Sequence, residues 1–283
     1  MPQAMVFRRL PILLLLAFLI FPTVCIALTE TIGRAEDRQR SNFSFAGEPV
    51  PLGRPDVYES LDQELLLLSE AKARVWLTLR RSPRYLPIIG SALTNAGVPQ
   101  DFRFLPMALA NLDPHYRSGG SGGFWRLSEP YAAGLGLTVN KLLDQRMDPE
   151  ASSVAAATRI ASLSKSYGGW TMALAAFLDE GGLAQAVQES GGVADYYSLY
   201  VNENLQKSVS QVLAGKILYS SPQSYGYNLS KAWPPIGRRV QVAGEGRMGK
   251  IAADNGVDYK SLRDLNPHVR TDVVPSGTTI YLP

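Results

Sequence analysis

Cysteine and histidine are scarce in this chain. Its one cysteine is Cys25, and its two histidines, His115 and His268, each follow a proline in a sequence typical of loops. A single cysteine excludes an intrachain disulfide, and these residues are too few for a metal site rich in cysteine or histidine. We therefore predict no metal and no cofactor, and we expect both histidines at the surface.

The chain also has little net charge for its 283 residues. The formal charge of +3 includes Arg8 and Arg9, so the sequence beyond them is close to neutral. This balance excludes a protein that binds nucleic acid through a basic surface. The hydrophobic content of 46% is instead typical of a globular protein with a sizeable core.

The N-terminus has the pattern of an export signal. Arg8 and Arg9 precede an apolar run at residues 10–21, and Cys25 to Ala27 supply small residues for cleavage. We predict that residues 1–27 are a signal peptide or an uncleaved N-terminal anchor, and Cys25 leaves lipidation open. Any contact with a membrane is expected only through this segment.

Residues 28–55 are polar and contain Pro49, Pro51 and Pro55, which predicts a tether. Beyond it, apolar residues recur at spacings of three and four, and glycine and proline mark the breaks. A glycine-rich loop is expected at residues 118–123. The predicted helices cover residues 56–79, 85–96, 104–111, 125–133, 148–167, 170–178, 183–189 and 197–218.

The pattern changes after a proline-rich linker at residues 225–237. Residues 240–242 and 279–282 alternate like strands, whereas residues 248–255 and 259–266 have the spacing of short helices. Residues 238–283 are therefore expected to form a small α+β module with the order βααβ. The fold class predicted for the whole chain is mainly α.

The block at residues 56–224 resembles the lytic murein transglycosylase D group. The matching stretches run in order along the chain: RRSPRYLPII at 80–89, AGVP at 96–99, FLP at 104–106, GFW at 123–125 and DPE at 148–150. The resemblance implies an all-helical, goose-type lysozyme-like (SLT) domain whose substrate is peptidoglycan. It places Ser118, Trp125, Arg126, Tyr131 and Phe177 along the glycan cleft.

The module at residues 238–283 resembles a LysM domain, which binds glycans that contain N-acetylglucosamine. The match rests on LNP at 265–267, VP at 274–275, GT at 277–278 and IYLP at 280–283. The resemblance implies that Gly244, Glu245, Asn266 and Pro267 contact the glycan.

The chain departs from the transglycosylase pattern where the chemistry takes place. Leu109 and Ala110 stand where the family has its Glu-Ser pair, Arg126 replaces the glutamine of Trp-Gln-Phe, and residues 176–181 depart from Ala-Tyr-Asn-Ala-Gly. Cleavage of the glycosidic bond requires a carboxylic acid that protonates the leaving oxygen, and leucine has no proton to donate. These changes together indicate loss of turnover.

Three other carboxylates are candidates for a substitute acid, namely Asp113, Glu129 and Glu180. Each also suits a structural role: Asp113 at a helix end, Glu129 on a solvated face, and Asp179 with Glu180 in a polar turn. Of the aromatic residues Trp125, Tyr131, Tyr196 and Tyr197, we expect at least half to pack in the core.

The leading hypothesis is an exported protein of the periplasm or cell envelope that binds peptidoglycan glycan strands without cleaving them. Two alternatives remain open. One is an active transglycosylase that cleaves the MurNAc-GlcNAc bond with a displaced carboxylate. The other is an envelope scaffold that binds a protein partner.

Overall fold

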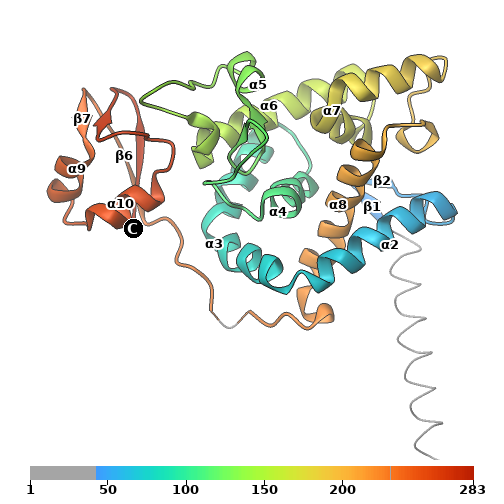
Figure 1. Ribbon diagram of the computed structural model, residues 1–283, viewed down its shortest axis with the longest axis horizontal. Helices are drawn as coiled ribbons and strands as arrows, with labels where there is room; N and C mark the ends of the chain where they lie inside the picture. Colours follow the sequence, from blue (N-terminus) through green and yellow to red (C-terminus); the bar gives the residue numbers. More distant parts are fainter. Residues whose placement is uncertain (1–42, 230) are drawn as a thin grey trace, which may run out of the picture. The chain divides into compact units, whose positions relative to one another are not determined.

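The computed structural model describes residues 43–229 and 231–283, and the fold is mainly helical with a few small sheets (Figure 1). The predicted export segment at residues 1–27 and most of the predicted tether lie outside the described residues. Residues 45–283 form one compact unit. In the described part of the chain, no helix combines the length and the apolar character that crossing a membrane requires.

The first two helices of the described chain are long, α2 at Pro55–Glu70 and α3 at Lys72–Asn95. The sequence predicted a break near residue 80, but α3 continues through Pro83 and Pro87. One face of α3 repeats buried residues every three or four positions and packs against α6, so tertiary burial outweighs the hydrogen bonds that the prolines remove. The buried residues on this face are Val75, Thr78, Leu79, Tyr85, Ile89, Ala92 and Leu93.

The short helix α4, Phe104–Ala110, follows the 3-10 turn η1 at Gln100–Arg103, and all seven of its residues are buried. It packs against α8, Glu203–Ser220. The contact is close at Gly215, because a Cβ there would lie 2.8 Å from the Cβ of Ala108. Any larger residue at position 215 would push the two helices apart.

A three-stranded antiparallel sheet stands where the sequence predicted only a glycine-rich loop. Its strands are β3 at Arg117–Ser118, β4 at Ser121–Gly122 and β5 at Leu127–Ser128. Gly123 has a φ of 68° and lies so close to the backbone of Arg146 that a Cβ would be 1.7 Å from its carbonyl oxygen. Only glycine fits at this position.

The helix predicted at residues 125–133 begins later, as α5 at Glu129–Gly134. The side chain of Ser128 caps it by accepting a hydrogen bond from the Tyr131 amide. Trp125 therefore lies outside the helix, because strand β5 lies between Trp125 and the start of α5. A cap that accepts an amide hydrogen fixes the start of a helix more sharply than apolar spacing does.

The next two helices begin where the sequence predicted. Asp148 follows the 3-10 turn η2, Gln145–Met147, and caps α6, Pro149–Tyr167. Helix α7, Trp170–Glu189, spans both predicted segments and has a kink at Asp179, where φ is −156° and ψ is 86°. The helix predicted at residues 197–218 is instead the 3-10 turn η3, Tyr196–Ser198, followed by α8, which begins after the Asn202 cap.

Residues just before α2 belong to the fold, so the predicted tether does not extend to residue 55. Strands β1, Ser44–Phe45, and β2, Glu48–Pro49, pair with each other. The buried ring of Phe45 lies 5.2 Å from that of Phe102. The Glu48 carboxylate accepts hydrogen bonds from the amides of Trp170 and Thr171 at 2.6 and 2.8 Å, which caps α7.

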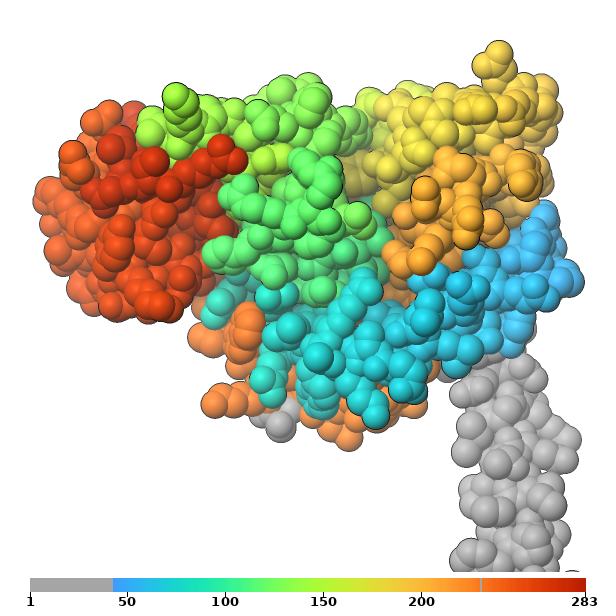
Figure 2. Space-filling model, in the orientation of Figure 1, coloured from blue at the N-terminus to red at the C-terminus, as the bar shows by residue number. Residues whose placement is uncertain are grey.

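The C-terminal residues follow the predicted βααβ order. After the 3-10 turn η4, Pro222–Tyr225, strands β6 and β9 pair antiparallel, and an additional short pair, β7 with β8, was not predicted. The elements are β6 Arg238–Gln241, β7 Gly246–Arg247, α9 Met248–Asp254, α10 Tyr259–Leu265, β8 Val273–Val274 and β9 Thr279–Leu282. Figure 2 shows these residues in orange and red, next to residues coloured green.

Candidate functional site

The end of α4 carries an apolar side chain where the resemblance implies a catalytic carboxylate. Leu109 is only 7% exposed and Ala110 is fully buried. The chain then takes a left-handed conformation at Asn111 (φ 54°) and again at Leu112 (φ 50°), which strains the backbone at a buried leucine. Because the Leu112 amide still reaches the Pro106 carbonyl at 3.1 Å, the tight turn closes the helix.

Two arginines of α3 hold this turn. Arg74 donates to the Asn111 side chain at 2.6 Å and also to the Ala108 carbonyl. Arg81 donates to the Asn111 carbonyl and to the Asp113 carboxylate, both at 3.0 Å. Asp113 additionally accepts the His115 amide at 3.0 Å. The Asp113 carboxylate thus holds the turn after α4, which is the structural role predicted for it at a helix end.

Aromatic side chains predicted for the glycan cleft pack against one another. The ring of Phe177 lies 6.1 Å from the rings of both Trp125 and Tyr131. Trp125 is buried and its indole donates to the Ser153 hydroxyl at 3.0 Å. Trp125 and Phe177 therefore belong to the core, and Tyr131 is half-buried at its margin. Tyr196 is buried too, so the expectation that at least half of the four aromatic residues pack in the core is confirmed.

Glu180 and Tyr131 meet through one arginine. Arg159 donates to the Tyr131 hydroxyl at 3.3 Å and pairs with Glu180 at 2.5 Å. Burial raises the pKa of the Tyr131 hydroxyl, although Arg159 acts in the opposite direction. The neighbouring Asp179 accepts the Gly182 amide at 2.9 Å and the Asn202 amide group at 3.1 Å, so it shapes the kink in α7.

The remaining residues predicted for this cleft are exposed. Ser118 lies in β3 and Glu129 in the first turn of α5, both open to solvent. Arg126 has a φ of 54°, and its guanidinium lies 5.4 Å from the ring centre of Tyr116. Sequence reasoning gave no signal for this pairing, because it depends on the turn between β4 and β5.

The three candidate acids have different surroundings. Asp113 accepts hydrogen bonds from Arg81 and from the His115 amide, one at each oxygen, and one oxygen of Glu180 accepts a hydrogen bond from Arg159. Glu129 is solvated rather than enclosed. The described cavities have volumes of about 200, 410 and 160 Å³, and no residue predicted for the glycan cleft lines any of them.

In the C-terminal module, the four predicted glycan contacts have different surroundings. Gly244 and Glu245 are exposed between β6 and β7, and Pro267 is half-buried. Asn266 is fully buried. Its side chain donates to the carbonyls of Leu262 and Tyr281 at 2.7 and 2.8 Å and accepts the Tyr281 amide at 2.8 Å. Asn266 therefore ties α10 to β9 and does not face a ligand.

The loop after α10 contacts the segment that precedes α6. Leu143 and Val269 form an antiparallel bridge, and Leu143 joins the apolar core of the C-terminal module. The fully buried Asp144 accepts two hydrogen bonds from Arg146 and one from Arg270, all at 2.8 Å. Burial opposes ionisation of Asp144, but the arginines outweigh it and lower its pKa. Sequence reasoning missed this contact because its partners lie 126 residues apart.

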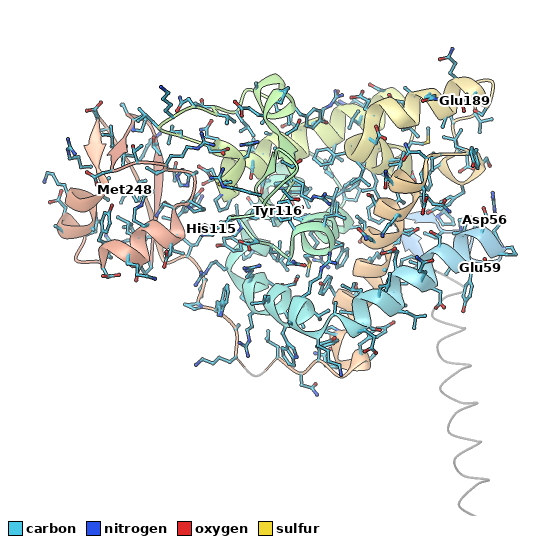
Figure 3. All side chains as sticks on the ribbon, viewed as in Figure 1. Asp56, Glu59, His115, Tyr116, Glu189 and Met248 are labelled. Carbon is cyan, nitrogen blue, oxygen red and sulfur yellow. The ribbon has the colours of Figure 1, made fainter. Side chains whose placement is uncertain are left out.

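A second contact centres on Asp148 and corrects one expectation. The buried Tyr281 hydroxyl donates to the Asp148 carboxylate at 2.6 Å. His268 is also fully buried, with its Nε2 2.9 Å from the Thr279 carbonyl and 3.8 Å from Asp148. The prediction of a surface histidine is wrong at His268, because the segment before α6 covers its loop, and it is confirmed at the exposed His115 (Figure 3).

No model of a known protein family matches this chain, and no curated protein matches it significantly. Among residues 43–229 and 231–283, no group of histidine, cysteine and acidic side chains is placed to hold a metal ion.

Proposed function

We propose that the protein binds peptidoglycan without cleaving it. In this proposal residues 56–224 are a lytic transglycosylase-like (SLT) domain without its acid, and residues 238–283 are a LysM-like module. The observation that carries the proposal is the buried Leu109 at the end of α4, while the candidate acids Asp113 and Glu180 pair with Arg81 and Arg159. A general acid is the one group that this reaction cannot omit.

Glycan binding does not require a general acid, so it remains chemically reasonable in the absence of catalysis. The loop that carries Gly244 and Glu245 is exposed, so a glycan can contact both residues without displacing any part of the fold. The export pattern at residues 1–27 would bring the chain to the periplasm or cell envelope, where peptidoglycan lies.

Sedimentation with purified peptidoglycan sacculi tests this proposal. We expect full-length protein in the pellet with sacculi and in the supernatant without them. A variant that combines Gly244→Val and Glu245→Ala should pellet less, because it places a branched side chain in the exposed loop and removes a polar group without touching the core. Wild-type protein that stays in the supernatant would contradict the proposal and favour the envelope scaffold.

A further inference from the structure

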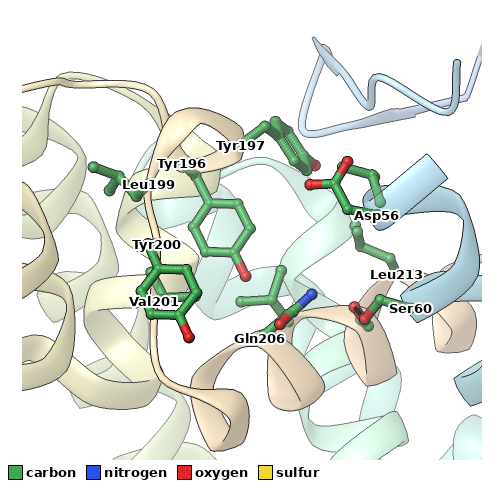
Figure 4. A pocket seen from close by; sticks show the side chains of 12 residues that line it. Asp56, Ser60, Tyr196, Tyr197, Leu199, Tyr200, Val201, Gln206 and Leu213 are labelled. Carbon is green, nitrogen blue, oxygen red and sulfur yellow. Dashed lines mark hydrogen bonds between the residues drawn. The ribbon is translucent and has the colours of Figure 1, made fainter. Parts of the chain in front are cut away.

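Two adjoining cavities lie between α2, the segment around η3 and the first half of α8. The first has a volume of about 200 Å³ and the second about 410 Å³. They share the lining residues Asp56, Ser60 and Gln206. Figure 4 shows Tyr196, Tyr200 and Gln206 around the first cavity, with Asp56 and Ser60 presented from α2.

A buried carboxylate without a partner lines the second cavity. Glu64 is only 5% exposed, and no hydrogen bond or ion pair reaches its side chain from any residue that the structure describes. The enclosed polar atoms that lack a partner belong to Tyr197, Tyr219 and His268, so the Glu64 oxygens are not sealed in the interior. They face the cavity. A carboxylate that no residue of the described chain pairs with is open to a cation from solution.

The charges around Glu64 favour a cation. Glu59 and Glu203 line the same cavity, and Lys207 is the one basic residue among its lining residues. Asp56 lines it too, but its carboxylate pairs with Arg54 at 2.7 Å. Figure 3 places Asp56 and Glu59 on α2. Carboxylates of one sign along a concave surface raise the local concentration of positive ligands. The acidic groups in the described chain are not arranged to hold a metal ion, which favours an organic cation.

The first cavity adds aromatic surface to this charge. Tyr196 is buried within its wall, whereas Tyr200 is 92% exposed at its mouth. Tyrosine rings attract ammonium groups through their faces and also pack against aliphatic chains. Leu213 and Val209 complete an apolar floor. A ligand with an amine at the end of an aliphatic chain would therefore match both cavities.

We propose that the joined cavities bind a primary ammonium group on an aliphatic chain, with Glu64 as its counter-ion. This inference rests on the proposed function, within which the ligand is the free amine of the diamino acid in a peptidoglycan stem peptide. The ammonium donates to Glu64, and the side chains of Asp56 and Gln206 lie within the same cavity wall. The aliphatic part of the diamino acid packs on the tyrosines.

Calorimetric titration of the full-length protein tests this assignment. The probe is a synthetic stem tripeptide with an acetylated N-terminus and a free side-chain amine; the comparison peptide is acetylated at that amine too. We expect the free-amine peptide to bind and the fully acetylated peptide to show at least tenfold weaker binding. Equal affinity for both peptides would overturn the inference. A simple diamine that binds as tightly as the tripeptide would support the ammonium site and contradict its assignment to the stem peptide.

Substitutions of single glutamates test where the ligand binds. Glu64→Gln keeps the shape of the side chain and should weaken binding at least tenfold, whereas Glu70→Gln, on an exposed part of the same helix, should leave it unchanged. If Glu64→Gln lowers the melting temperature, the exposed Glu203→Gln carries the test, with an expected loss of several-fold. Unchanged binding in both cavity variants contradicts the inference.

Sedimentation with sacculi separates this inference from the proposed function. Protein that pellets with sacculi but ignores the tripeptide overturns the ammonium site and leaves peptidoglycan binding intact. Protein that binds the tripeptide but stays in the supernatant supports the site and contradicts glycan-strand binding.

Discussion

At the scale of single residues, the proposal of a binding protein that does not cleave its ligand rests on Leu109. Its side chain fills the end of α4, whose seven residues are all buried. Arg74 and Arg81 fix the turn that follows, so the position has little freedom to accept a different group. Packing at α4 thus accounts for leucine at this position.

Substituting Leu109→Glu should destabilise the protein without creating a lytic enzyme. A carboxylate at this position loses apolar burial and has no partner in place, so we expect the free energy of unfolding to fall by about 3 kcal/mol or more. Urea unfolding measures the loss. Leu109→Met, which keeps the volume, should cost less than about 1.5 kcal/mol. A Leu109→Glu variant of wild-type stability that cleaves sacculi would show an intact active cleft and contradict this account.

At the scale of elements, the contact between the C-terminal module and the segment before α6 depends on buried polar pairs. Tyr281→Phe removes the hydroxyl that donates to Asp148. Because a buried carboxylate then loses a donor, we expect a loss of about 1–3 kcal/mol in the free energy of unfolding. Tyr259→Phe is the matched control, since Tyr259 is exposed and should change stability little. Equal stability of the two variants would mean that the contact adds nothing.

The same contact should make stability depend on pH. Burial lowers the pKa of His268; Asp148 and the Thr279 carbonyl oppose this shift, and Arg263 adds to it. The remaining group that faces the imidazole is the ring of Tyr281, 5.7 Å away, whose hydroxyl donates to Asp148. The unfolded chain therefore binds a proton below about pH 6.5 more readily than the folded protein does. The free energy of unfolding should fall as the pH drops through this range.

Urea unfolding between pH 5 and 8 tests this dependence. His268→Gln should flatten the slope between pH 5 and 7, whereas His115→Gln, at the exposed histidine, should retain it. The lowered pKa of Asp144 adds a further loss only at more acidic pH, which begins at the usual pKa of a carboxyl group and continues below it. An unchanged slope in His268→Gln would remove His268 as its cause.

The elements that the sequence predicted best are those with local signals. Asp148 before Pro149 is a cap that needs no distant partner, and the strand predicted at residues 279–282 is β9, although its last three residues are all buried instead of alternating. The failures required partners far along the chain: α3 continues through Pro83 because α6 covers it, and Phe45 is buried because it meets Phe102.

The residues of the candidate site also divide into those with a local sequence signal and those whose surroundings depend on distant partners. The absence of an acid at Leu109 could be predicted from one position, and the structural roles of Asp113 and Asp179 followed from turn chemistry. Burial of Asn266 and the unpartnered Glu64 could not be predicted, since neither position carries a local signal for its neighbours.

At the scale of the whole molecule, the proposal of binding without cleavage combines two exposed surfaces with arginine-paired carboxylates. The loop of Gly244 and Glu245 is exposed, and the cavities beside α2 present carboxylates and tyrosines. The carboxylates nearest the predicted cleft are held by Arg81 and Arg159. This combination is the reason for proposing a peptidoglycan-binding protein.

The most direct test of that claim is mass spectrometry of the products released from sacculi. Full-length protein would be incubated with sacculi, beside a buffer blank and an active lytic transglycosylase, and the supernatant analysed for 1,6-anhydro-muropeptides. The account predicts protein in the pellet and no anhydro products above the blank. Anhydro products that disappear on substituting Glu129, Asp113 or Glu180 would contradict it and identify a displaced acid.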